Sequence, residues 1–228
     1  FHGGYPTSNQ WTEGLVDIIH PQKSWQVQES NTRQKSSGAF AQISLYKPEL
    51  NFGISSTTPL LETEWDTIWK IWETALSFGL GCRVAAGYGQ VVPRQLSNML
   101  FRCRIKGQGP ASKCLDGSLE FRPNIFRAAL RGHALRIFGG LSSDRNAESL
   151  VDTLFGGIQK NEGKWGLLAM QFNERSLDLN TQKGTYSVMG DLSWRLTQPI
   201  SLDHQSVLKD LIKRLMQFAM LLGGFGKS

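Results

Sequence analysis

The chain has 228 residues, of which 40% are hydrophobic and 19% charged, a composition typical of a globular protein rather than a disordered one. No apolar run approaches the roughly 18–20 residues of a membrane-spanning helix. The net charge of +6 is uneven: residues 1–92 carry 6 Lys and Arg against 8 Asp and Glu, and residues 93–228 carry 19 against 11. This asymmetry favours a polyanionic partner for the second part, although a merely basic surface is an alternative interpretation.

The cysteines argue against a disulfide framework, because they are few and odd in number: Cys82, Cys103 and Cys114. Their scarcity fits a reducing cytosol, so a cytoplasmic location is predicted. No CxxC motif occurs, and the four histidines lack the spacing of zinc ligands. A structural metal site is therefore not expected.

In the first part, residues 1–38 are rich in Gly, Ser, Gln and Asn and predict an extended loop. Apolar alternation predicts strands at 39–46 and 50–55, which we expect to pair as a hairpin. A helix is predicted from Glu64 to Ser77. Its stripe of tryptophans and aliphatic residues is typical of core packing, which we prefer to a base-stacking surface. A glycine-rich loop and a strand ending at Val92 complete this part.

In the second part, Pro93 breaks the chain and marks the predicted module boundary. A strand at 98–106 alternates apolar residues with Arg102, Arg104 and Lys106, which predicts one basic face. The remaining predicted elements are helices at about 122–138, 145–155 and 204–222 and strands near 167–172 and 187–196.

The order strand–helix–strand–strand–helix fits a ferredoxin-like unit that lacks its last strand. Residues 1–92 fit the C-terminal half of another such unit. We therefore predict an α+β fold with two ferredoxin-like (RRM-like) modules, 1–92 and 93–228, the first and last incomplete. The chain is expected to be a piece of a longer protein.

The first candidate site is the glycine-rich segment Gly79-Leu-Gly-Cys-Arg83, followed by Gly87-Tyr88-Gly89. Glycines permit positive φ, and successive amides of such a loop can form an anion-binding nest. The spacing does not match a nucleotide-binding P-loop. A tight helix-to-strand turn is an equally acceptable interpretation.

The second candidate site lies at the start of the 122–138 helix. Asn124, Arg127 and Arg131 are spaced i, i+3 and i+7 and so share one face. A helix N-terminus attracts anions, and two guanidinium groups there would clamp a phosphate. The alternative is a solvated basic face.

Several segments resemble the RAMP (repeat-associated mysterious protein) superfamily of CRISPR. The segment Phe121-Arg-Pro-Asn-Ile-Phe-Arg-Ala-Ala-Leu-Arg-Gly132 with Leu154-Phe-Gly-Gly157 resembles the family's first-helix signature, although Pro-Asn-Ile-Phe replaces its Pro-Gly-Ser-Ser core. Gly79–Val91 resembles the glycine-rich element, and Gly223-Gly-Phe-Gly226 a second copy. Asp17-Ile-Ile-His-Pro21 resembles a segment of the type III backbone subunit.

The resemblance implies a backbone subunit of a CRISPR type III RNA-targeting complex, acting in antiviral defence. Its partners would be guide RNA (crRNA), target RNA and other RAMP subunits, with no membrane. The subunit would hold guide phosphates and present the guide to target RNA. The RNA-binding candidates are Asn124, Arg127, Arg131, Arg83, Gly87, Tyr88 and Gly89.

Three alternative functions stay open. Some RAMP proteins cleave target RNA through a loop Asp, and Asp116 lies in the corresponding loop, where it would hold Mg²⁺; the alternative for this Asp-Gly pair is a turn. Guide processing through a histidine, His20 or His133, is another enzymatic alternative. A scaffold that binds only protein is the third, against which the +8 charge of residues 93–228 argues. No cofactor is expected unless Mg²⁺ serves catalysis.

Overall fold

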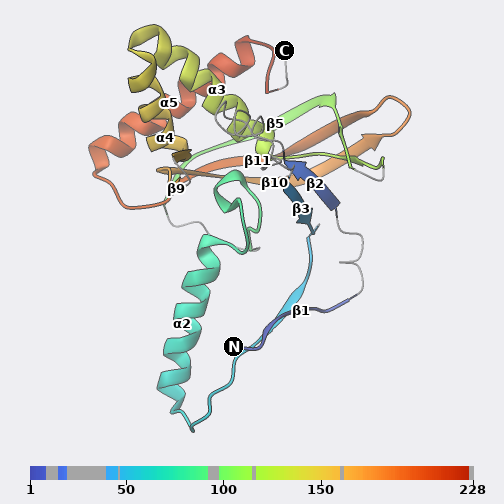
Figure 1. Cartoon of the computed structure of the whole chain (residues 1–228), viewed down its shortest axis with the longest axis vertical. Coiled ribbons are helices and arrows are strands. Elements are labelled where there is room, and N and C mark those ends of the chain that lie inside the picture. Colours follow the sequence, from blue (N-terminus) through green and yellow to red (C-terminus); the bar gives the residue numbers. More distant parts are fainter. Residues whose placement is uncertain are drawn as a thin grey trace, which may run out of the picture. The chain divides into compact units, whose positions relative to one another are not determined.

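The computed structural model describes residues 1–8, 15–19, 40–45, 47–91, 98–114, 117–159 and 162–225 (Figure 1). The chain divides into two compact units. The first unit comprises residues 1–65 and 112–120, and the second unit comprises residues 66–111 and 121–228. Helices and antiparallel strands occur together, which confirms the predicted α+β class. The module boundary at Pro93 lies outside the described residues and stays a prediction.

In its described residues, the first unit contains three short antiparallel strand pairs. They are β1 (Gly3–Pro6) with β4 (Leu50–Gly53), β2 (Leu15–Ile19) with β3 (Phe40–Ser44), and β6 (Ser112–Lys113) with β7 (Leu119–Glu120). The predicted strands at 39–46 and 50–55 therefore exist as β3 and β4. The predicted hairpin between them is wrong, because each pairs with a strand from nearer the N-terminus.

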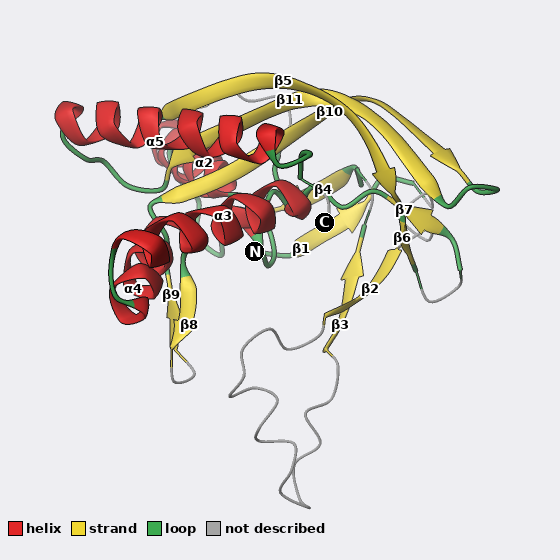
Figure 2. Cartoon of the chain, turned by 90° about the horizontal axis from the view of Figure 1, so that it is seen from above, coloured by secondary structure: helices red, strands yellow, loops and turns green. Residues whose placement is uncertain are grey.

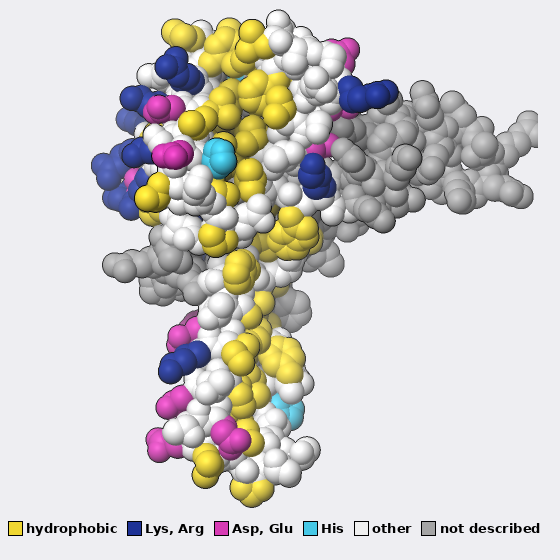
Figure 3. Space-filling model, turned by 90° about the vertical axis from the view of Figure 1, so that its left-hand side faces the viewer, with side chains coloured by type: hydrophobic (Ala, Val, Ile, Leu, Met, Phe, Trp, Pro, Cys, Tyr) yellow, Lys and Arg dark blue, Asp and Glu magenta, His cyan; other side chains and the backbone are white. Residues whose placement is uncertain are grey.

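Helix α2 (Glu62–Phe78) links the two units in sequence. Leu61 precedes it, and Glu64 caps its first turn by accepting a hydrogen bond from the Leu61 N–H at 2.8 Å. The expectation that its tryptophan stripe is core is wrong: no residue of α2 is buried, and Trp69 is 43% exposed. Hydrophobic side chains accordingly run along the surface of this helix (Figure 3).

After α2, the chain forms a short 3-10 helix, η3 (Val84–Ala86), within the glycine-rich segment. No strand occurs in the described residues 79–91, so the strand predicted there is absent from that range. The segment is closed on itself by a hydrogen bond from the Leu80 N–H to the Gly89 carbonyl at 2.8 Å.

The second unit contains a three-stranded antiparallel sheet in the order β10–β11–β5. The strands are β5 (Met99–Pro110), β10 (Leu168–Asn180) and β11 (Thr185–Leu196). Because β11 is antiparallel to both neighbours, β5 and β10 run parallel to each other. Helices α3 (Asn124–Leu141) and α4 (Asp144–Phe155) and the small hairpin of β8 (Gly157–Gln159) and β9 (Glu162–Lys164) connect β5 to β10.

Helix α5 (Leu202–Leu221) follows β11 and lies with α3 on one face of the sheet (Figure 2). Its start is fixed by Ser201, whose hydroxyl accepts a hydrogen bond from the His204 N–H, as an N-cap does. The predicted helix positions are confirmed to within a few residues, because each is amphipathic along its own length.

The core of the second unit lies between this sheet face and the three helices. Trp194 and Met170 of the sheet are fully buried, as are Leu130 of α3, Val151 of α4 and Ile212 of α5. Truncating one large buried side chain of this kind to alanine lowers the free energy of unfolding by on the order of 2–5 kcal/mol. This core therefore fixes where α3 and α4 present their polar side chains.

Candidate nucleic-acid interface

Helix α3 carries the predicted residues Asn124, Arg127 and Arg131, all partly buried. Asn124 is the first residue of the helix, after Pro123. The adjoining face of α3 buries Phe126 and Leu130 in the core. The core contacts therefore hold the polar stripe in one orientation, as the i, i+3, i+7 spacing predicts.

Arg127 is held by the C-terminal end of α4. Its Nη2 donates a hydrogen bond to the carbonyl oxygen of Phe155. Burial, together with the smaller effects of the nearby Arg131 and Arg83, lowers the pKa of Arg127 to about 10. Its Nε is buried and has no hydrogen-bond partner among the described residues. The hydrogen-bonding groups of this guanidinium are thus only partly satisfied within the described fold.

Arg131 forms an ion pair with a residue of α4 that lies one helical turn before Phe155. Its Nη2 lies 2.7 Å from Oδ1 of Asp152, a carboxylate that is only 3% exposed. A charge buried to this degree requires a partner. This ion pair therefore joins α3 to α4, a role that the sequence pattern alone did not reveal.

The glycine-rich segment brings Arg83 near Arg127 of α3. Arg83 adopts the left-handed conformation with φ of 59° at the start of η3, and its side chain is exposed. It lies close enough to Arg127 to lower the pKa of that guanidinium. Gly87, with φ of 96°, approaches Met170 of β10 so closely that a Cβ would lie 2.7 Å from the methionine methyl carbon. A side chain at this position would therefore require the flexible end of Met170 to move, and the positive φ would disfavour it as well.

The two candidate motifs thus meet in one group of arginines, Arg83, Arg127 and Arg131, called the arginine cluster below. Two of its members hold α3 to α4, and Arg83 is the exposed one. Tyr88 and Gly89 lie in the same segment: the Gly89 carbonyl closes it, and the Tyr88 carbonyl accepts a weak hydrogen bond from Gln90. The arrangement leaves excess positive charge beside α3.

A second group of arginines lies on the sheet. Asp191 of β11 accepts hydrogen bonds from Arg175 at 2.7 Å, Arg102 at 3.1 Å and Arg104 at 3.5 Å. Alternation in the sequence predicted the basic face with Arg102 and Arg104, and their exposed side chains, with that of Lys106, confirm it. The sequence did not predict the participation of Arg175 and Asp191, because the residues that they contact lie on other strands.

The contribution of the Asp191 ion pairs to stability can be tested by acidification. The hydrogen bond from Arg175 lowers the pKa of Asp191, Arg102 adds to this, and burial opposes it. The ionised carboxylate therefore stabilises the fold above the unfolded pKa of about 3.9, and this contribution disappears as pH falls through the lower folded-state value. We expect the difference in Tm between the wild type and Asp191→Asn to shrink on acidification below about pH 4. Circular dichroism melts measure it; exposed Asp178→Asn is the control, and a pH-independent difference would contradict the assignment.

The predicted catalytic residues find no support in the described fold. Asp116 and His20 lie outside the described residues. His133 is buried against the ring of Phe218, and burial and Arg136 lower its pKa, which favours the neutral form of a core histidine. No group of three or more His, Cys, Asp and Glu side chains that could hold a metal ion occurs among the residues that the structure describes.

Comparison with known proteins adds no assignment. No protein-family model, curated protein or solved structure matches this chain. Within the described ranges, none of the helices has both the length and the apolar character required to cross a membrane. A functional conclusion therefore depends on the arrangement of the chain's own residues.

Proposed function

We propose that the chain binds RNA by its sugar-phosphate backbone, through the arginine cluster. The observation that carries this proposal is the convergence of Arg83, Arg127 and Arg131 from two separate segments, with Asp152 as the paired carboxylate. Guanidinium groups bind phosphate oxygens through two parallel hydrogen bonds. Phosphate contacts position a strand without reading its sequence. The cluster suits a protein that accepts RNA of any sequence.

The topology of the second unit supports this function. The chain passes from β5 through α3 and α4 to β10, β11 and α5, with β11 between the other two strands. This order supports the proposal of a ferredoxin-like unit without its last strand. We infer that residues 98–111 and 121–225 form such a unit. Ferredoxin-like sheets are a frequent platform for single-stranded RNA, as in RRM domains.

The finer proposal rests on the resemblance to RAMP proteins. In it, the chain is a guide-RNA-binding backbone subunit of a CRISPR type III complex in the cytoplasm, with guide RNA, target RNA and other RAMP subunits as partners. The closed glycine segment and the α3 signature that carry the resemblance lie together in the second unit. Cleavage of RNA is not part of the proposal, since no observation favours it.

Binding of labelled single-stranded RNA of mixed sequence, followed by fluorescence anisotropy, tests the proposal. We expect Arg83→Gln to weaken RNA binding about tenfold, the value of one charge-assisted contact. The slope of log affinity against log salt should become shallower by about 0.7, since one phosphate contact is lost. Both effects should be equal for RNAs of different sequence.

The matched control is Arg214→Gln on α5, which removes the same charge from an exposed side chain outside the cluster. It should leave affinity within about twofold, because only general screening changes. If the wild-type chain does not bind RNA, or if both variants lose affinity equally, the arginine cluster is not an RNA site. A strong sequence preference would also contradict backbone recognition.

A further inference from the structure

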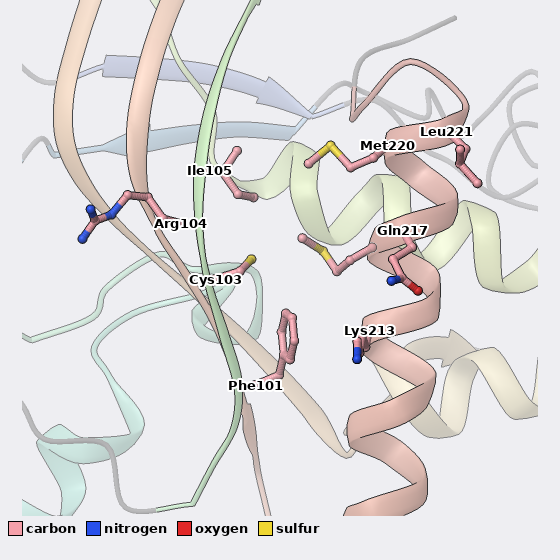
Figure 4. A pocket seen from close by; sticks show the side chains of 9 residues that line it. Phe101, Cys103, Arg104, Ile105, Lys213, Gln217, Met220 and Leu221 are labelled. Atoms are coloured by element: carbon pink, nitrogen blue, oxygen red, sulfur yellow. The ribbon is translucent and has the colours of Figure 1, made fainter.

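The sheet of the second unit has a polar face on the side opposite its helices. In β11, Leu192 and Trp194 are buried in the core between sheet and helices, so Asp191, which alternates with them, belongs to the other face. Figure 4 shows the same alternation on β5: Cys103 points toward α5, whereas Arg104 points away from it. A further strand beside β5, as a complete ferredoxin-like unit has, would extend this face and not cover it. The polar face is thus a property of β5, β10 and β11 themselves.

Three arginines, called the sheet arginines below, converge on this face. Arg102 and Arg104 from β5 and Arg175 from β10 all donate hydrogen bonds to Asp191, at 3.1, 3.5 and 2.7 Å. Arg175 lies at a β-bulge, where the pairing register of β10 with β11 shifts, and a bulge redirects a side chain. Lys106 occupies the next alternate position of β5 after Arg104. Four cations and one carboxylate thus share this part of the face.

The sheet arginines keep both exposure and hydrogen-bonding capacity. The side chains of Arg102, Arg104 and Arg175 are 50%, 62% and 47% exposed, whereas that of Asp191 is 8% exposed. A guanidinium group has five N–H donors, and within the described part of the chain each of the three uses one of them, for Asp191. The carboxylate therefore orients the guanidinium groups, and their other donors are available to a ligand.

The composition of this face favours phosphate groups over bases as its ligand. RRM sheets bind RNA by stacking bases on aromatic side chains. The aromatic residues of β5, β10 and β11 pack on the helix side instead; they are Phe101, Phe172, Tyr186 and Trp194. Strand β5 has no acidic residue, and the other carboxylate of this face, Asp178, lies opposite Ser187, four residues from Asp191 along β11. Converging guanidinium donors without aromatic neighbours are suited to phosphate oxygens.

We propose that the sheet arginines and Lys106 form a second phosphate-binding surface, which takes a segment of RNA separate from the one bound by the arginine cluster. The inference rests on the proposed function, because it takes RNA as the ligand of this unit. Arg127 and Arg131 belong to α3, on one face of the sheet, and the sheet arginines belong to the other face. A short strand therefore occupies one surface, and only a strand that passes around the sheet reaches both.

Two substitutions with little effect on the fold test this surface. Arg104→Gln removes the longest of the three hydrogen bonds to Asp191, and Lys106 is exposed. We expect the variant with both Arg104→Gln and Lys106→Gln to bind labelled single-stranded RNA of mixed sequence at least about tenfold more weakly in fluorescence anisotropy. The slope of log affinity against log salt should become shallower by about 1.4, since two phosphate contacts are lost. The matched control, Lys209→Gln with Arg214→Gln at exposed residues of α5, should stay within about threefold.

Photocrosslinking locates the bound RNA independently of affinity. The probe is an RNA of about six nucleotides that contains thiouridine, near the short end of single-strand site sizes, and crosslinked peptides are identified by mass spectrometry. In the wild type we expect crosslinks both to residues 99–110 of β5 and to the glycine-rich segment. Arg83→Gln should reduce the crosslinks to the glycine-rich segment and leave those to β5. The variant with Arg104→Gln and Lys106→Gln should do the reverse.

The outcomes separate this inference from the proposed function. If the folded variant with Arg104→Gln and Lys106→Gln binds RNA as the wild type does, the sheet surface is not an RNA site, and the arginine cluster stands. If that variant loses affinity and Arg83→Gln does not, the cluster fails and the sheet surface stands. A chain that binds no RNA overturns both. Binding of polyglutamate that this variant alone loses, with RNA binding unchanged, would overturn the inference in favour of an acidic protein partner.

Discussion

Replacing Arg131 with alanine is expected to lower the free energy of unfolding by about 3 kcal/mol, the usual effect of removing one partner of a buried ion pair. Asp152 is only 3% exposed, and Arg131 lies 2.7 Å from its Oδ1. Arg131→Ala removes this charged partner from a carboxylate that is almost fully buried, which is unfavourable. Chemical denaturation monitored by circular dichroism measures the change.

A double-mutant cycle separates the ion pair from general effects. Arg131→Gln combined with Asp152→Asn should be more stable than the sum of the two single variants predicts, since the neutral pair leaves no buried charge. Arg136→Ala on the same helix is the control for losing an arginine from α3. Additive behaviour, or an Arg131→Ala protein as stable as the wild type, would show that the pair contributes nothing and that Arg131 is free for a phosphate.

This result bears on the RNA proposal. Arg127 and Arg131 already bind the α4 residues Phe155 and Asp152, so replacing either changes the fold as well as the cluster charge. A loss of RNA binding in such variants is informative only in protein shown to be folded. Arg83, which is exposed, is therefore the better test of phosphate binding.

The second large effect is expected at Gly89. Its φ is +59°, and a Cβ at this position would lie 1.7 Å from the Leu80 carbonyl oxygen, a backbone atom that cannot rotate aside. The same two residues close the segment by the Leu80 N–H to Gly89 carbonyl hydrogen bond. Gly89→Ala should therefore open the segment and lower the free energy of unfolding by about 3 kcal/mol, well beyond positive-φ strain alone.

Gly81→Ala is the matched control. Gly81 also has a positive φ, of 77°, but a Cβ there would meet nothing within 4 Å. Its cost should be about 1 kcal/mol, from backbone conformation only. Thermal melts of the two variants give the comparison. Equal stabilities would mean that Gly89 is needed for its φ and not for the close approach to Leu80.

The effect of Gly89→Ala on RNA affinity depends on Arg83. The closed segment holds Arg83 beside Arg127. Opening it should weaken RNA binding to about the level of Arg83→Gln, about tenfold. Gly81→Ala should bind nearly as well as the wild type.

Apolar periodicity in the sequence predicted the main helices and strands of the second unit and the α+β class, but not η3 or the β8–β9 hairpin. The helices α3, α4 and α5 and the strands β5, β10 and β11 were predicted because apolar periodicity is a local property of each segment. The basic face of β5 followed from the same rule. The α3 and glycine motifs were also located, although their partners were not.

The contacts of each polar or apolar face depend on segments that are distant in sequence, so they could be read from the three-dimensional structure alone. The tryptophan stripe of α2 predicts an apolar face, yet no pattern within the helix shows what covers it, and its residues are not buried. The strands β3 and β4 pair with β2 and β1 rather than with each other, because pairing depends on distant segments.

The arginines show the same limit most clearly. Spacing placed Arg127 and Arg131 on one face of α3, but their partners Phe155 and Asp152 are more than twenty residues away on α4. Arg83 precedes the predicted boundary at Pro93 and still lies beside Arg127, because the glycine segment packs on β10. Electrostatic partners are set by distance in space, and a sequence pattern gives only distance along the chain.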